Sequence, residues 1–200
     1  GAKSTQGYMW LDAYRRSAFD RIYDDFFYRR NNEFWKEKAM QKLPALLDST
    51  GMLACGEDLG MIPATVPQVM DDLRILSLEI QRMPKSVEET FAHPANYPYL
   101  SVCTTSTHDM NPIRAWWEED RQVTNDFWQM ILGNQGEAPY FCEPWICRQI
   151  LEQHVWSPAM LTILPLQDWL SMDAQLRRED PNTERINVPA NSRHYWRYRM

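Results

Sequence analysis

The sequence lacks any excess of positive charge and any long apolar run. Its 27 acidic and 21 basic side chains give a net charge of -6 at pH 7. Nucleic acids and anionic membrane surfaces attract positively charged proteins, so we expect neither as a main partner. No stretch approaches the ~20 apolar residues that a helix needs to cross a bilayer. The sequence therefore predicts no transmembrane helix.

Cysteine is scarce as well, with only four residues in 200, at positions 55, 103, 142 and 147. A chain of this length can build its own hydrophobic core, so free thiols in a cytoplasmic protein are the simplest interpretation. Cys142 and Cys147 lack the two-residue gap of a zinc knuckle, and no second Cys or His pair accompanies them. We expect no metal site.

The seven glycines and thirteen prolines fall mostly between the expected elements. Residues 1–7 lack the apolar run of a signal peptide, and we leave open whether they derive in part from an expression vector. From residue 8 to residue 47, apolar side chains such as Tyr14, Ala18 and Ile22 recur every three to four positions, which predicts helix. Pro44 lies inside this pattern, so the helix should kink or end nearby.

Four short apolar runs follow and predict strands. They cover residues 52–56, 76–80, 99–105 and 160–164. Helical patterns at residues 66–74, 112–132 and 144–154 lie between them. Strands that alternate with helices are typical of β/α units around a parallel sheet, so we predict an α/β fold. Residues 177–200 show no clear periodicity, which indicates long C-terminal loops.

Acidic residues stand where three of these strands end. Glu57 follows the first run, Asp109 the third and Asp168 the fourth. In a parallel β/α barrel the active site lies at the carboxyl ends of the strands. Glycosyl transfer needs carboxyl groups there to donate a proton and to face a cationic transition state. Each acid alone would more simply be a solvated loop residue or a helix cap, but their shared placement favours a catalytic role.

Longer motifs resemble those of one enzyme family. Residues 56–63 (GEDLGMIP) resemble the signature loop of amylomaltases, and residues 107–109 (THD) resemble the second signature of that family. Residues 80–84 (IQRMP), 114–119 (RAWWEE), 165–168 (PLQD) and 185–189 (RINVP) match as well. The chain is thus similar to 4-α-glucanotransferases of the amylomaltase type from about Phe26 to its last residue. The resemblance implies that residues 1–200 form a single partial domain, the C-terminal half of a (β/α)8 TIM-type barrel with a helical N-terminal segment.

The resemblance also implies roles for individual residues. Glu57 would be the general acid/base. Asp109 would bind the sugar at the cleavage point and stabilise the transition state, and His108 would contact the same ring. The other expected substrate-binding residues are Asn96, Trp117 and Tyr195. No metal, nucleotide or organic cofactor is implied, because the mechanism runs on carboxyl groups.

Neighbouring residues keep alternative interpretations. Asp58 follows Glu57 directly, and structural hydrogen bonds within the loop are its favoured role. Glu79 lies inside an apolar strand, where it either points toward the site or pairs with Arg82. Of the adjacent Trp116 and Trp117, we expect one in the core and the other at a groove, since tryptophan suits both packing and sugar rings.

One residue that the resemblance requires is missing. Retaining enzymes of this family use a carboxylate nucleophile in an Arg-x-Asp-His-type motif on the strand before the one that carries Glu57. The aspartates between Gly1 and Leu47 lie in the helical pattern instead; they are Asp12, Asp20, Asp24 and Asp25. Asp168 belongs to a separate family motif, which gives it a structural role. We therefore expect a fragment that begins after the fourth strand and is inactive alone.

The combined prediction is a fragment of a 4-α-glucanotransferase. Its parent would move α-1,4-glucan segments from malto-oligosaccharides, or from glycogen- and starch-derived glucans, by a retaining double displacement. Two alternatives stay open, a non-catalytic glucan-binding or interaction module and a hydrolytic α-glucanase. A half barrel leaves strand edges uncovered, so we expect self-association if these residues fold alone. The expected location is the cytoplasm.

Overall fold

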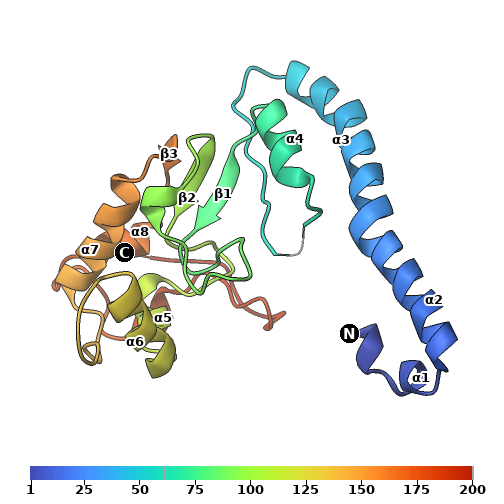
Figure 1. Cartoon of the computed structure of the whole chain (residues 1–200). Coiled ribbons are helices and arrows are strands. Elements are labelled where there is room, and N and C mark those ends of the chain that lie inside the picture. The colour runs from blue at the N-terminus through green and yellow to red at the C-terminus, as the bar shows by residue number, and fades with distance from the viewer. Residues whose placement is uncertain (61, 200) are drawn as a thin grey trace. The chain divides into compact units, whose positions relative to one another are not determined.

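The computed structural model describes residues 1–60 and 62–199. The chain divides into two compact units (Figure 1). Unit 1 comprises Gly1–Ala54 and Gly60–Ile75, and unit 2 comprises Cys55–Leu59 and Leu76–Met200. The single partial domain expected for residues 1–200 stays a prediction. None of the helices in the described residues is long and apolar enough to span a membrane.

Unit 1 is built from helices, as the three-to-four spacing predicts. Its elements are η1 (Ala2–Ser4), α1 (Gln6–Met9), α2 (Ala13–Asp24), the π-helical η2 (Asp25–Arg30), α3 (Asn31–Asp48) and α4 (Val66–Asp72). Asp12 starts α2 because its carboxylate accepts a hydrogen bond from Arg15 N. The helix then runs through η2 and α3 as one long rod (Figure 1). Pro44 lies inside α3, which ends one turn later.

Few apolar side chains of unit 1 are buried. Val66, Met70 and Ile75 form a small core cluster, against which Trp35 and Leu43 of α3 pack. Helices α1 and α2 and the η2 segment contain no buried residue, and α3 contains only Ala39. Aromatic residues of these helices stay exposed instead; they include Tyr14, Phe26, Tyr28 and Phe34.

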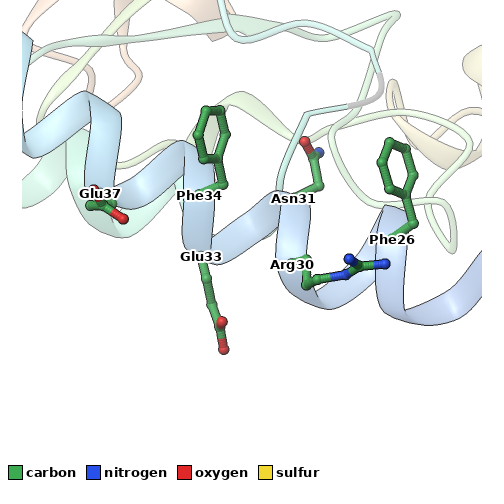
Figure 2. Close-up of a pocket in the computed structure, with 6 residues that line it drawn as sticks. All are labelled: Phe26, Arg30, Asn31, Glu33, Phe34 and Glu37. Carbon is green, nitrogen blue, oxygen red and sulfur yellow. The ribbon is translucent and has the colours of Figure 1, made fainter. Parts of the chain in front are cut away.

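A hollow of about 550 Å³ lies along this exposed rod. Its lining residues all come from η2 and α3, and they are Phe26, Arg30, Asn31, Glu33, Phe34 and Glu37. Figure 2 shows the rings of Phe26 and Phe34 on one side of the helix, while Glu33 points to the other. The hollow is therefore a surface feature of one helix, and its side chains do not converge on a common point.

Unit 2 contains a parallel sheet in the order β1-β2-β3. The strands are β1 (Ser77–Ile80), β2 (Ser101–Thr104) and β3 (Leu161–Thr162). Leu78 pairs with Val102, and Val102 with Leu161, so these three side chains share one face of the sheet. The parallel β/α arrangement and three of the four predicted strands are confirmed.

The first predicted strand, at residues 52–56, is wrong. Only an isolated parallel bridge between Cys55 and Leu76 forms there. Met52 and Leu53 are 77% and 55% exposed, so their apolar side chains gain no packing from a strand conformation. Apolar sequence alone does not make a strand where no neighbouring surface covers it.

The helices of unit 2 surround a well-packed core. They are η3 (Pro94–Asn96), α5 (Ile113–Trp117), α6 (Arg121–Met130), α7 (Pro144–Val155), α8 (Leu166–Leu170) and η4 (Pro181–Glu184). The single helix expected at residues 112–132 is split, because Asp120 caps a new helix by accepting hydrogen bonds from Gln122 N and Val123 N. Trp117, Phe127, Ile146 and Leu151 are buried together in this core.

The tail from residue 177 onward is irregular apart from η4, as the sequence predicts. A buried ion pair anchors it, since Arg114 Nη1 lies 3.1 Å from Glu184 Oε1. The same guanidinium donates to the carbonyl of Arg178 at 2.8 Å. Burial raises the pKa of Glu184, and Arg114 opposes that rise. This part of the tail is therefore held inside the unit despite its lack of regular structure.

Candidate active site

The segment Cys55–Leu59 carries Glu57 and is fixed beside β1. Gly56 N donates to the carbonyl of Leu76 at 2.8 Å, and Leu78 N donates to Asp58 Oδ1 at 2.9 Å. Asp58 is buried, and its bond from Leu78 N agrees with a structural role, although this bond goes to β1 and not to the loop itself. The neighbouring Glu57 is exposed. The backbone is thus held on both sides of a carboxyl group that stays free to react.

A cavity of about 310 Å³ lies at this end of the sheet. Its lining residues are Cys55, Gly56, Glu57, Leu78, Val102, Thr104, Ser106, Thr107, His108 and Ile163. They come from the Glu57 segment, from one face of the sheet and from the carboxyl ends of β2 and β3. Glu57 and His108, which are 51 positions apart in the sequence, therefore line the same cavity. Of the three acids predicted at strand ends, only Glu57 belongs to the described lining of this cavity, and Asp109 and Asp168 do not.

The buried carboxylate of Asp168 binds the loop that follows β2. Asp168 accepts hydrogen bonds from Thr105 Oγ1 at 2.6 Å and from Ile113 N at 2.9 Å. Burial raises the pKa of Asp168, and these hydrogen bonds oppose the rise. The contacts agree with the structural role that the sequence assigns to Asp168.

Arg82, two residues after β1, binds the same loop. Its guanidinium donates to the carbonyls of Thr105 and Asn111, and it lies 4.9 Å from the centre of the Trp116 ring. Burial lowers its pKa to about 10, which leaves the side chain charged at neutral pH. Of the two roles left open for Glu79, pairing with Arg82 is therefore wrong, because Glu79 pairs with Lys85 at 2.6 Å while Arg82 donates to backbone carbonyls.

The carboxylate of Asp109 meets the C-terminal tail. Asn187 Nδ2 donates to its Oδ1 at 2.5 Å, and Arg185 donates to its backbone carbonyl at 3.3 Å. His108 Nε2 lies 3.5 Å from the other oxygen, and the His108 ring is 5.2 Å from that of Trp196. Asp109 is half exposed. It stands beside His108 but does not belong to the described lining of the 310 Å³ cavity.

A second, smaller cavity of about 180 Å³ lies against the same loop. Its lining residues are Ser106, Thr107, His108, Met110, Pro112, Pro165, Gln167 and Ile186. Ser106, Thr107 and His108 line both cavities. The loop after β2 thus forms a partition between a cavity that reaches Glu57 and one that reaches the tail.

The structure overturns one predicted sugar contact and leaves two untested. Trp117 is fully buried and its indole N–H donates to the carbonyl of Pro139 at 2.9 Å, so no ring face is open to a sugar. Trp116 is the partly exposed member of the pair. Asn96 and Tyr195 are exposed, but neither lines either cavity among the described residues. Their roles stay predictions.

Sequence reasoning did not single out Asn187 as a site residue, and it predicted no contact between Trp196 and His108. Asn187 lies within the RINVP motif, and Trp196 within an aromatic tail. Those patterns indicate a family match but give no partner, because the contacts to Asp109 and His108 join residues 78 and 88 positions apart.

A carboxyl group that faces a cavity at the carboxyl ends of parallel strands defines an α/β protein with an enzyme-like site. A family model described as 4-alpha-glucanotransferase matches residues 4–200, and the chain belongs to this family. It is 40% identical over 198 residues to 4-alpha-glucanotransferase DPE2 of Oryza sativa subsp. japonica, covering 99% of this chain and 21% of that protein. It is 32% identical over 161 residues to a 4-alpha-glucanotransferase of Chlamydia muridarum, covering 79% of this chain and 30% of that protein.

A solved structure shares the fold. The amylomaltase from Streptococcus agalactiae in complex with acarbose superimposes with a TM-score of 0.57 and 20% identity, over 78% of this chain and 30% of that one. The chain therefore has the α/β fold of part of an amylomaltase, and it spans only about a fifth to a third of the relatives it matches. That it forms the C-terminal half of an eight-stranded barrel stays a prediction.

Proposed function

We propose that this chain supplies the acid/base portion of the active site of a longer 4-α-glucanotransferase. That enzyme transfers α-1,4-glucan segments between malto-oligosaccharides, or from glycogen- and starch-derived glucans, with retention of configuration. The observation that carries the proposal is that Glu57 and His108 line the same cavity at the carboxyl ends of the strands. Membership of the 4-alpha-glucanotransferase family supports the reaction class.

In the proposed reaction Glu57 acts first as a general acid and then as a general base. Its carboxyl group protonates the departing glycosidic oxygen, and its carboxylate later takes the proton of the incoming sugar hydroxyl. An exposed side chain on an anchored backbone suits this role, because the carboxyl group must meet two different partners in one place. Asp109, held by Asn187, accepts hydrogen bonds from the sugar beside His108.

The nucleophile is proposed to lie outside these 200 residues. Among the acids that precede Glu57, Asp12 caps α2, while Asp20 and Asp24 lie within α2 and Asp25 begins η2. All four belong to unit 1. The isolated chain should then form no covalent glycosyl intermediate and show no turnover.

The test uses the longer protein and maltotriose. Transfer yields glucose together with oligomers longer than maltotriose. Replacing Glu57 with Gln should lower the rate about 10²–10⁴-fold, which is the usual contribution of a general acid/base. The matched control is Glu33→Gln, an exposed acid of unit 1, and its rate should equal that of the wild type. An unchanged rate in the Glu57 variant would end the assignment.

Two other functions give different results in the same experiments. A hydrolytic α-glucanase would release only glucose and maltose. A non-catalytic glucan-binding module would show no turnover in the longer protein, yet the 200-residue chain would bind maltoheptaose. Trp196 beside His108 offers a reporter for that binding. Unchanged tryptophan fluorescence at millimolar sugar would argue against a preserved binding surface.

We also propose that the isolated chain self-associates. The proposed location of the protein is the cytoplasm. In the described residues β3 is an edge strand of the sheet, and Leu161 and Ile163 on it or next to it are 39% and 61% exposed. Exposed strand edges with apolar side chains pair readily with a second chain. Analytical ultracentrifugation should detect a dimer or larger species, and a monomer at all concentrations would refute the proposal.

A further inference from the structure

A cluster of three charges lies beside the Glu57 segment and has no part in the proposed reaction. Lys85 Nζ is 2.7 Å from Asp58 Oδ2 and 2.6 Å from Glu79 Oε1. The side chains of Asp58 and Glu79 are 4% and 12% exposed, and that of Lys85 is 27% exposed. One ammonium group therefore bridges two carboxylates that have little access to water.

The bridge joins two parts of the chain. Glu79 belongs to β1, where Ser77 Oγ also donates to its carboxylate at 2.8 Å. Asp58 belongs to the Glu57 segment and accepts from Leu78 N through its other oxygen. Both oxygens of Asp58 are thus bound to groups in or just after β1. Removing the lysine would leave two buried carboxylates without a counter-charge. Their mutual repulsion and the cost of burying them would then move them apart or toward water.

We propose that Lys85 is a positioning residue that holds Glu57 at the cavity through Asp58. Glu57 and Asp58 are adjacent, so their Cα atoms are separated by only ~3.8 Å and a shift of Asp58 carries Glu57 with it. A displacement of about 1 Å at a reacting group costs on the order of 10²-fold in rate. The inference rests on the proposed function, since it gives Lys85 a task only if Glu57 is the acid/base.

The two acids provide a matched pair that separates positioning from simple stabilisation. Asp58→Asn retains the acceptor for Leu78 N but loses the ion pair on the Glu57 segment. Glu79→Gln loses an ion pair to the same lysine but leaves Asp58 bound to Lys85 and Leu78. A purely structural lysine would make both variants alike in stability and in activity per folded molecule.

Kinetics of the longer protein on maltotriose provide the first test. Lys85→Met and Asp58→Asn should lower kcat about 10–100-fold with KM changed less than about threefold. Glu79→Gln should lower kcat less than about threefold. Lys85→Arg, which can donate to both carboxylates, should stay within about fivefold of the wild type. The proposal is overturned if Asp58→Asn keeps kcat within twofold of the wild type, or if Glu79→Gln loses as much as Asp58→Asn.

Hydrogen exchange in the 200-residue chain provides a test that needs no activity. In Lys85→Met the amides of Gly56 and Leu78 should exchange at least about tenfold faster than in the wild type, while amides in the middle of α7 keep their rates. If Lys85→Met does not fold, Asp58→Asn gives the same comparison for Gly56. Unchanged exchange at these amides overturns the positioning role. A wild-type longer protein without transfer activity would refute the proposed function, yet the exchange result would still decide whether Lys85 holds the segment.

Discussion

The two units of this chain bury their side chains very differently. The helical rod of unit 1 from Ala13 to Asp48 contains Ala39 as its only buried residue. Unit 2 buries large side chains of its core almost completely, such as Trp117 and Phe127, and it also buries charged groups such as Asp168 and Arg114. Every residue that the structure places in the candidate active site belongs to unit 2.

This contrast shows what a site of polar groups requires. A buried carboxylate is costly unless hydrogen bonds and counter-charges surround it, and only a packed unit can hold such partners in place. Unit 2 does so with Asp168, which binds the loop after β2, and with Asp58, which ties the Glu57 segment to β1. The charged residues of unit 1 are mostly solvated on the helix surface, where they position nothing for chemistry.

The largest difference should appear in native-state hydrogen exchange. Opening α2 exposes no buried side chain, whereas opening α7 exposes residues such as Ile146 and Leu151. Amides in the middle of α7 should therefore exchange at least about 10³-fold more slowly than those of α2. The measurement is NMR-detected exchange at neutral pH on the 200-residue chain. Equal protection in the two helices would contradict the proposed difference in packing between the two units.

Truncating one tryptophan in each unit should give a smaller contrast. Trp117→Ala leaves a large hole in the core of unit 2 and should cost about 3–5 kcal/mol of unfolding free energy. Trp35 is only partly buried in unit 1, so Trp35→Ala should cost about 1–2 kcal/mol. Urea unfolding followed by circular dichroism measures both.

If Trp117→Ala does not fold, Trp117→Phe removes the hydrogen bond to Pro139 with a smaller loss of volume. That variant should still lose more stability than one in which Trp35 is replaced by Phe. Equal losses in the two units would show that they are packed alike.

The smallest predicted effect concerns pH. All four histidines lie in unit 2, and burial lowers the pKa of His154 from 6.5 to about 4, with Arg82 adding to the fall. The unfolded chain therefore binds this proton first as the pH falls. The stability that neutral His154 provides is complete above about pH 6.5 and is lost between that value and about pH 4.

From pH 7.5 to pH 5 the loss should be about 2 kcal/mol. Other groups titrate in this range, so the test compares urea midpoints of the wild type and His154→Gln at both pH values. The wild type should lose more stability on acidification than the variant does. His93→Gln, at an exposed position, should follow the wild type. Parallel losses in the wild type and His154→Gln would contradict the assignment.

Much of unit 2 could be predicted from local sequence pattern. Apolar runs located β1, β2 and β3, and the order of strands and helices gave a parallel sheet. The same rule failed at Met52 and Leu53, since apolar residues form a strand only where another surface covers them. Periodicity also missed the break before α6, which depends on the capping carboxylate of Asp120.

The candidate site was predictable only in part. The strand-end rule pointed to Glu57, which lines the cavity, but also to Asp109 and Asp168, which do not belong to its described lining. The family motifs added His108, which lines the same cavity as Glu57. The sequence could not show that Trp117 is the fully buried member of the Trp116–Trp117 pair, because the two side chains are identical and only the tertiary fold distinguishes their environments. Nor could it pair Lys85 with Asp58 or Asn187 with Asp109, because these contacts depend on the tertiary fold.

The ion pair between Arg114 and Glu184 limits how far the chain can be shortened at its C-terminal end. Irregular tails are the usual candidates for trimming when a protein is shortened or fused to another. Ending the polypeptide at residue 176 would strand the guanidinium of Arg114 in the interior, and it would also remove Asn187 from Asp109. We then expect the shortened chain to lose solubility, while the carboxylate of Asp109 loses its hydrogen bond from Asn187. A domain boundary drawn from regular secondary structure alone would cut through the interior of the protein.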